Sequence, residues 1–155
     1  MKSLIVYCSD YKKNTEKIAQ IFAEKVDSDL KNIKEINDIN LEVYDLVGFG
    51  SGVYKESMSP KVFKLVEKLN LKGKNVFVFS TSGMGMKFYN NRLIKLLESK
   101  GAINKGSFSC KGNFKASEFT NIKIFNIMSR LSQGHPSDKD MKKAEKFIVK
   151  VANSL

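Results

Sequence analysis

The chain has 155 residues, the size of one ordinary domain, and we expect a single domain over residues 1–155 that needs no disulfide or metal to hold its core. The 2 cysteines form no CxxC or Cys/His spacing, and no stretch approaches the roughly 20 apolar residues of a membrane span, so we expect a cytoplasmic protein without a metal site or membrane contact. The 27 lysines and arginines against 16 aspartates and glutamates give a net charge of +11, but they are spread over almost every predicted helix, which favours solvated helix faces over a nucleic-acid site.

Apolar runs alternate with amphipathic stretches along the chain, which predicts alternating strands and helices. The predicted elements are, in chain order, a strand at 2–8, a helix at 15–26, a weak edge strand at 29–33, a strand at 44–50, a helix from Pro60 to Leu69, a strand at 75–79, a helix at 88–100, a strand at 102–110 and a last helix after Ser137. Residues 111–134 show helical spacing without a strand signal, and we interpret them as an insertion. The alternation predicts an α/β fold, a doubly wound parallel sheet with helices on both faces.

Three polar segments follow predicted strands, at the edge of the sheet where ligands of this fold class bind. The first runs from Ser9 to Thr15 and leads into a helix, so its hydroxyls, its backbone N–H groups and the helix dipole predict an anion or phosphate site. The lysines at 12 and 13 would add positive charge. The other segments, 51–54 and 80–85, combine glycine with hydroxyls, which suits a flat polar ring held close to the backbone. Tyr54 could stack on such a ring, and Tyr89 is a weaker candidate.

The sequence resembles the flavodoxin family, specifically small flavodoxin-like proteins of anaerobic bacteria and archaea. The resemblance rests on Leu4-Ile5-Val6-Tyr7 with Asn14-Thr15-Glu16, on the run from Asp45 to Tyr54, and on Phe79-Ser80-Thr81-Ser82-Gly83-Met84. It implies a five-stranded sheet of order 2-1-3-4-5, FMN as cofactor, and electron transfer. The implied cofactor-binding residues are Ser9, Asp10, Lys12, Lys13, Asn14, Thr15, Ser51, Gly52, Val53, Tyr54, Ser80, Thr81, Ser82, Gly83 and Met84.

The phosphate loop departs from the family pattern. That pattern runs hydroxyl, any residue, Thr, Gly, any residue, Thr, whereas residues 10–15 keep only the last hydroxyl. Asp10 would repel a phosphate, and Lys13 lacks the tolerance of glycine for positive φ. The two lysines could offset the repulsion, since an exposed charge pair is worth about 1 kcal/mol.

The leading hypothesis is therefore an FMN-binding electron carrier; if the protein is an enzyme, it is an FMN-dependent oxidoreductase, and no catalytic residue stands out. Its redox partner would carry an acidic docking surface, because this chain is basic. The alternative is a flavodoxin-fold binding or regulatory module in which FMN binding is weak or lost. Cys8 is expected inside a strand, Cys110 is a candidate for solvent exposure, and His135 reads as a structural turn residue.

Overall fold

The computed structural model describes residues 1–114 and 123–155. Its core is a parallel sheet of order β2-β1-β3-β5-β6, which confirms the predicted order of the five main strands. A short strand, β4, pairs antiparallel with the end of β3. The strands are β1 (Ser3–Cys8), β2 (Asp29–Asn32), β3 (Leu46–Tyr54), β4 (Ser57–Met58), β5 (Asn75–Ser82) and β6 (Ile103–Lys111).

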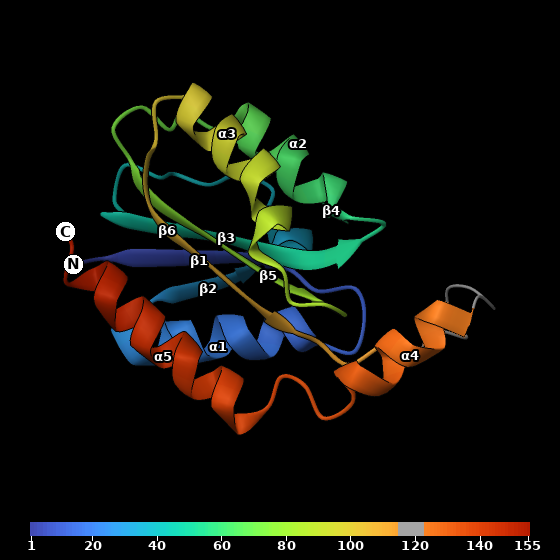
Figure 1. Cartoon of the computed structure of the whole chain (residues 1–155). Helices are drawn as coiled ribbons and strands as arrows, with labels where there is room; N and C mark the ends of the chain where they lie inside the picture. The colour runs from blue at the N-terminus through green and yellow to red at the C-terminus, as the bar shows by residue number, and fades with distance from the viewer. Residues whose placement is uncertain (115–122) are drawn as a thin grey trace.

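Helices cover both faces of the sheet, as the alternating sequence predicts. Helices α1 and α5 pack on one face and α2 and α3 on the other, while α4 lies beyond the carboxyl edge of the strands (Figure 1). The helices are α1 (Asn14–Val26), α2 (Pro60–Lys68), α3 (Asn91–Ser99), α4 (Lys123–Ser132) and α5 (Asp138–Ala152), with 3-10 turns η1 (Ile33–Glu35) and η2 (Lys87–Asn90). None of the described helices is both long and apolar enough to cross a membrane.

Each buried strand sends alternate side chains to the two faces, because successive side chains of a strand point in opposite directions. On β5, Val76 and Val78 join the cluster under α2 and α3, whereas Phe77 and Phe79 join the cluster under α1 and α5. The ring of Phe22 from α1 meets both phenylalanines edge to face, at centroid distances of 5.6 and 5.1 Å. This aromatic group anchors α1, and with it the loop that enters α1.

Two glycines of β3 make room for these rings. A Cβ atom on Gly48 would lie 2.3 Å from the ring of Phe77, and one on Gly50 would lie 2.2 Å from the ring of Phe79. The sequence suggested that the strand ends at residue 50, but the glycine-rich tail continues it. Strand β3 continues to Tyr54 and turns into β4, so residues 51–54 are a strand end and not a loop.

Three other expectations need adjustment. Phe88 lies in η2, because α3 begins only at Asn91. Cys110 is buried and not exposed, since it belongs to the core under α1 and α5. The predicted insertion 111–134 contains the end of β6 and helix α4, and its central part, 115–122, lies outside the described residues.

Candidate functional site

The three segments predicted to form the site do meet at the carboxyl edge of the sheet. The parallel register sets Cys8 beside Ser51 and Ser51 beside Ser80, so strands β1, β3 and β5 reach that edge at the same level. Their continuations, 9–13, 52–58 and 83–90, therefore surround one region.

The loop between β1 and α1 has an unusual backbone. Lys12 and Lys13 both adopt the left-handed conformation, with φ of 47° and 53°. The family pattern has glycine at the second of these positions, and the structure explains why, since residues other than glycine rarely adopt positive φ. Lys13 is also the N-cap residue of α1, and no side chain of the described residues caps this helix end. The first amides of α1 thus remain available to an anion.

Two hydrogen bonds connect this loop to its neighbours. The hydroxyl groups of Thr15 and Thr81 lie 2.8 Å apart and are buried, so the phosphate loop and the end of β5 are joined directly. The amide of Asn14 donates to the carbonyl of Asn113, at 2.8 Å, which ties the loop to the segment after β6.

Asp10 is neutralised by two lysines. Its carboxylate lies 2.8 Å from Lys34 Nζ of η1 and 3.2 Å from Lys61 Nζ of α2, and it accepts a weak hydrogen bond from the thiol of Cys8 at 3.4 Å. The hydrogen bond from Lys34 is the main cause that lowers the pKa of Asp10 below its ordinary value. Asp10 is consequently a paired anion, and the repulsion expected between it and a phosphate is reduced.

The end of β3 is built differently from the prediction. The hydroxyl of Ser51 accepts from the backbone N–H of Ser59, at 2.9 Å, and donates to the carbonyl of Gly52, so it serves the start of α2. Val53 packs against the core under α2 and α3. Tyr54 folds back over Gly52, where an added Cβ would lie 3.1 Å from its ring, and burial raises the pKa of Tyr54 to about 12.

The segment after β5 is held by its own turn and by Phe114. Ser82 Oγ accepts from the N–H of Gly85 at 2.7 Å. The ring of Phe114 packs on Gly83, where a Cβ would lie only 2.3 Å from it. Met84 is exposed beside this contact.

Two hydroxyls at this edge have no hydrogen-bond partner among the described residues. Ser9 Oγ and Ser80 Oγ are both buried, one at the end of β1 and one near the end of β5. A buried hydroxyl without a partner is costly, so each is a candidate contact for a bound ligand.

Sequence reasoning missed four residues of this region. Lys34, Lys61, Asn113 and Phe114 contact predicted site residues, but none belongs to the three predicted segments. No local pattern marks the two lysines. The other two follow the carboxyl end of β6, so a fourth segment at the same edge could have been predicted from the sheet order.

The described residues contain no group of three or more His, Cys, Asp and Glu side chains able to hold a metal. His135 lies 2.5 Å from Asp140, whose carboxylate also accepts from the N–H of Ser137 in the cap of α5. His135 is therefore part of the turn that leads into α5, which is the structural role that the sequence predicts for it. One surface hollow, of about 650 Å³, lies between the carboxyl-terminal parts of α1 and α5. Another, of about 570 Å³, lies at the amino edge of the sheet, and both are away from the three segments.

Comparison with known proteins agrees with this architecture. An uncharacterised protein of Methanocaldococcus jannaschii is 38% identical over 153 residues, which cover 97% of this chain and 98% of that protein. An archaeal flavodoxin superposes with a TM-score of 0.71 at 15% identity, covering 99% of this chain and 98% of that one. A flavoprotein from Lactobacillus acidophilus, solved in complex with FMN, superposes with a TM-score of 0.58 at 20% identity, over 68% of this chain and 91% of that one. A family model described as a flavodoxin domain matches residues 4–136, and the chain therefore belongs to the flavodoxin family.

Proposed function

We propose that the protein binds FMN at the carboxyl edge of β1, β3 and β5 and acts in electron transfer. The observation that carries the proposal is the set of unused polar groups at this edge. The amino end of α1 lacks a side-chain cap, and the buried hydroxyls of Ser9 and Ser80 lack partners within the described chain. Phosphate and a polar ring system are ligands that would use them. The similarity to a flavoprotein solved with FMN supports this choice of ligand.

The residues present fit such a cofactor. The first amides of α1, the hydroxyl of Thr15 and the lysines at 12 and 13 would hold its phosphate, while the backbone at Gly52 and the segment 80–83 would face its ring. Thr81 can donate to Thr15, which frees the Thr15 proton for an acceptor in the loop. Bound FMN would supply one-electron or two-electron transfer.

The titratable groups of the site favour a carrier over an acid–base catalyst. The pKa of Asp10 is lowered from 3.8, chiefly by the hydrogen bond from Lys34. Burial raises the pKa of Cys8 above 9.0 and the pKa of Tyr54 to about 12. None of these three groups changes its charge near neutral pH, so none is poised to exchange a proton with a substrate there.

Titration of FMN fluorescence tests the binding. We expect quenching at micromolar protein, and riboflavin, which lacks the phosphate, serves as the matched ligand control. FMN binding should weaken as salt is raised, because Lys12 and Lys13 attract the phosphate by charge, whereas riboflavin binding should change little. Absence of quenching by micromolar protein would rule out the proposed cofactor. Reduction of the FMN-loaded protein followed by electron transfer to an acceptor protein tests the second half of the proposal.

One observation favours a second candidate, a flavodoxin-fold module that binds FMN weakly or not at all. The ring of Phe114 lies on Gly83, on the segment whose backbone would face the cofactor ring. If Phe114 blocks the site, Phe114→Ala should tighten FMN binding. If the ring instead covers the bound cofactor, the same variant should weaken FMN binding. The binding or regulatory module is supported if both the unchanged chain and Phe114→Ala stay colourless after addition of FMN.

A further inference from the structure

The ring of Phe114 occupies a face of Gly83 that a flat ligand could otherwise use. A Cβ atom built on Gly83 would lie 2.3, 2.9 and 3.0 Å from three carbon atoms of this ring. Carbon atoms in contact normally lie about 3.5–4.0 Å apart, so a second ring cannot lie on this face while Phe114 is there. The segment 80–83 is where we propose that the cofactor ring lies, and the chain itself covers its last residue.

The two residues before Phe114 are anchored to the body of the domain. The N–H of Gly112 donates to the carbonyl of Ser82, at 2.9 Å, and the N–H of Asn113 donates to the carbonyl of His135, also at 2.9 Å. These bonds attach the chain after β6 to the end of β5 and to the turn before α5. The backbone of Phe114, in contrast, is bound to α4.

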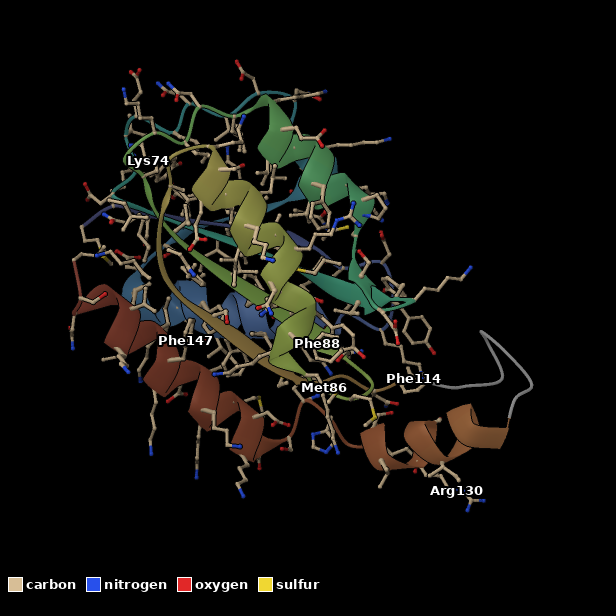
Figure 2. The ribbon with its side chains drawn as sticks, turned by 45° about the horizontal axis from the view of Figure 1, so that its top comes forward. Lys74, Met86, Phe88, Phe114, Arg130 and Phe147 are labelled. Atoms are coloured by element: carbon tan, nitrogen blue, oxygen red, sulfur yellow. The ribbon has the colours of Figure 1, made fainter. Side chains whose placement is uncertain are left out.

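Two serines of α4 hold the backbone of Phe114. Ser129 Oγ donates to its carbonyl at 2.8 Å, and its N–H donates to Ser132 Oγ at 3.3 Å. Both serine side chains are buried. A buried polar group that loses its partner is destabilising, so these bonds favour the position in which the ring of Phe114 covers Gly83. Figure 2 shows Phe114 at the carboxyl edge of the sheet, with Arg130 projecting from α4 away from the sheet.

We propose that Ser129 and Ser132 are positioning residues that hold Phe114 over Gly83 in the flavin-free chain, so that the flavin ring binds only when Phe114 leaves this position. The proposal rests on the proposed function for the identity of the ligand. The chain then has a closed form, with the ring on Gly83, and an open form that alone admits the flavin ring. The apparent affinity for flavin is the intrinsic affinity reduced by the open fraction, so a change that weakens the closed form tightens binding. Inorganic phosphate has no ring, so it should bind both forms equally and leave their ratio unchanged.

The affinities of two serine variants for FMN and riboflavin test the proposal in the full chain. Ser129→Ala removes the donor to the Phe114 carbonyl, and Ser132→Ala removes the acceptor of the Phe114 N–H, so each destabilises the closed form. Each variant should bind both flavins about threefold to tenfold tighter than the unchanged chain does. Ser99→Ala on α3 is the matched control, because Ser99 Oγ donates to a carbonyl three residues earlier, as Ser132 Oγ does. It should leave both affinities unchanged.

The direction of the change separates positioning from a merely structural role. If the serines only stabilise α4, their removal should weaken flavin binding or leave it unchanged, whereas release of Phe114 tightens it. Urea unfolding shows whether each variant is folded. Ser132 is 0% exposed, and if Ser132→Ala does not fold, Ser129→Ala alone decides the test. Flavin affinities in the folded serine variants that match or fall below those of the unchanged chain would overturn the proposal.

NMR spectroscopy detects the closed form directly, without an affinity measurement. In the flavin-free chain we expect a nuclear Overhauser contact between the α-protons of Gly83 and the ring protons of Phe114. Inorganic phosphate at millimolar concentration should leave this contact unchanged, whereas FMN or riboflavin should remove it. Persistence of the contact in the flavin-bound chain would show that the flavin ring does not need this face of Gly83, and the proposal would then be wrong.

The positioning role and the proposed function can fail separately. If the unchanged chain binds FMN and the serine variants bind it no tighter, the positioning role fails and the cofactor site stands. If FMN binds to Ser129→Ala, Ser132→Ala or Phe114→Ala but not to the unchanged chain, the proposed function of the unchanged chain fails and the positioning role stands. If neither the unchanged chain nor any of these variants binds either flavin, both proposals fail.

Discussion

The hydrogen bond between Thr15 and Thr81 offers the sharpest test of how the site is held together. Both hydroxyls are buried, 2.8 Å apart, in side chains from α1 and β5. Thr15→Val or Thr81→Val removes one hydroxyl and leaves the other buried without its partner, which costs about 1–3 kcal/mol. The double variant removes both hydroxyls and adds two methyl groups of similar shape, so it should be nearly neutral. The two single changes should therefore be strongly non-additive, with a coupling free energy of at least about 2 kcal/mol, the sum of the two single losses.

Urea unfolding of the flavin-free protein measures this coupling, and thermal unfolding gives a second estimate. For a chain of this size, 1 kcal/mol corresponds to about 2–4 °C in the unfolding midpoint. Binding supplies an independent measurement, because Thr81→Val should weaken FMN through the orientation of Thr15 and should weaken it more than riboflavin, which lacks the phosphate that Thr15 would hold. Additive losses in stability would show that the two hydroxyls do not depend on each other, and would refute the reasoning.

Three further predictions concern the same edge of the sheet. Lys13→Gly should raise or preserve the free energy of unfolding, because relief of about 1 kcal/mol of left-handed strain offsets the added freedom of the unfolded chain. The same variant should weaken FMN binding at low salt. Lys13→Asn, which also removes the charge but keeps a Cβ atom, serves as its control. Asp10→Asn should destabilise the fold at pH 7, because the pKa of Asp10 is depressed, chiefly by the hydrogen bond from Lys34. The contribution of the carboxylate to stability is present above the unfolded pKa and disappears as the carboxylate is protonated, so the effect of the variant should be lost below about pH 4. Equal differences in urea midpoint between the variant and the unchanged protein at pH 7 and pH 3 would contradict this. Cys8 and Cys110 should react with a thiol reagent at least about 100-fold more slowly in the folded protein than in urea, since burial raises the pKa of both, that of Cys110 to about 12.

The order of the sheet could be predicted because it depends on patterns that the sequence displays. Parallel strands covered on both faces are continuously apolar, as in Val76-Phe77-Val78-Phe79, and each needs a crossover helix before the next strand. The extent of β3 could not be predicted in the same way. Glycine normally weakens a strand, and only the three-dimensional register shows that Gly48 and Gly50 face the rings of Phe77 and Phe79.

The composition of the site was predictable only in part. Segments that follow parallel strands must meet at one edge, which is why Thr15 and Thr81 could be placed in the same site from sequence. The pairing of Asp10 with Lys34 and Lys61 depends on side-chain reach from η1 and α2, and any of many lysines could have served. In the same way, the hydrogen bond from the backbone N–H of Ser59 to the hydroxyl of Ser51 depends on the hairpin that brings the two residues together, and no local sequence pattern shows it.

These contacts determine which charges of the altered phosphate loop face an incoming anion. Asp10 is charged but held by two cations. The positive groups that remain at this end of α1 are Lys12, Lys13, which also lies 4.0 Å from the carboxylate of Glu16, and the uncapped amino end of the helix. Both lysines keep a backbone conformation that costs about 1–2 kcal/mol in a residue with a Cβ atom, where glycine would cost nothing. Local strain of this kind is found where surrounding structure holds a functional group in place. The loop therefore keeps left-handed residues without the glycine of the family pattern. If it binds phosphate as proposed, attraction by charge is added to attraction by backbone amides, and we expect its affinity for phosphate to depend on salt.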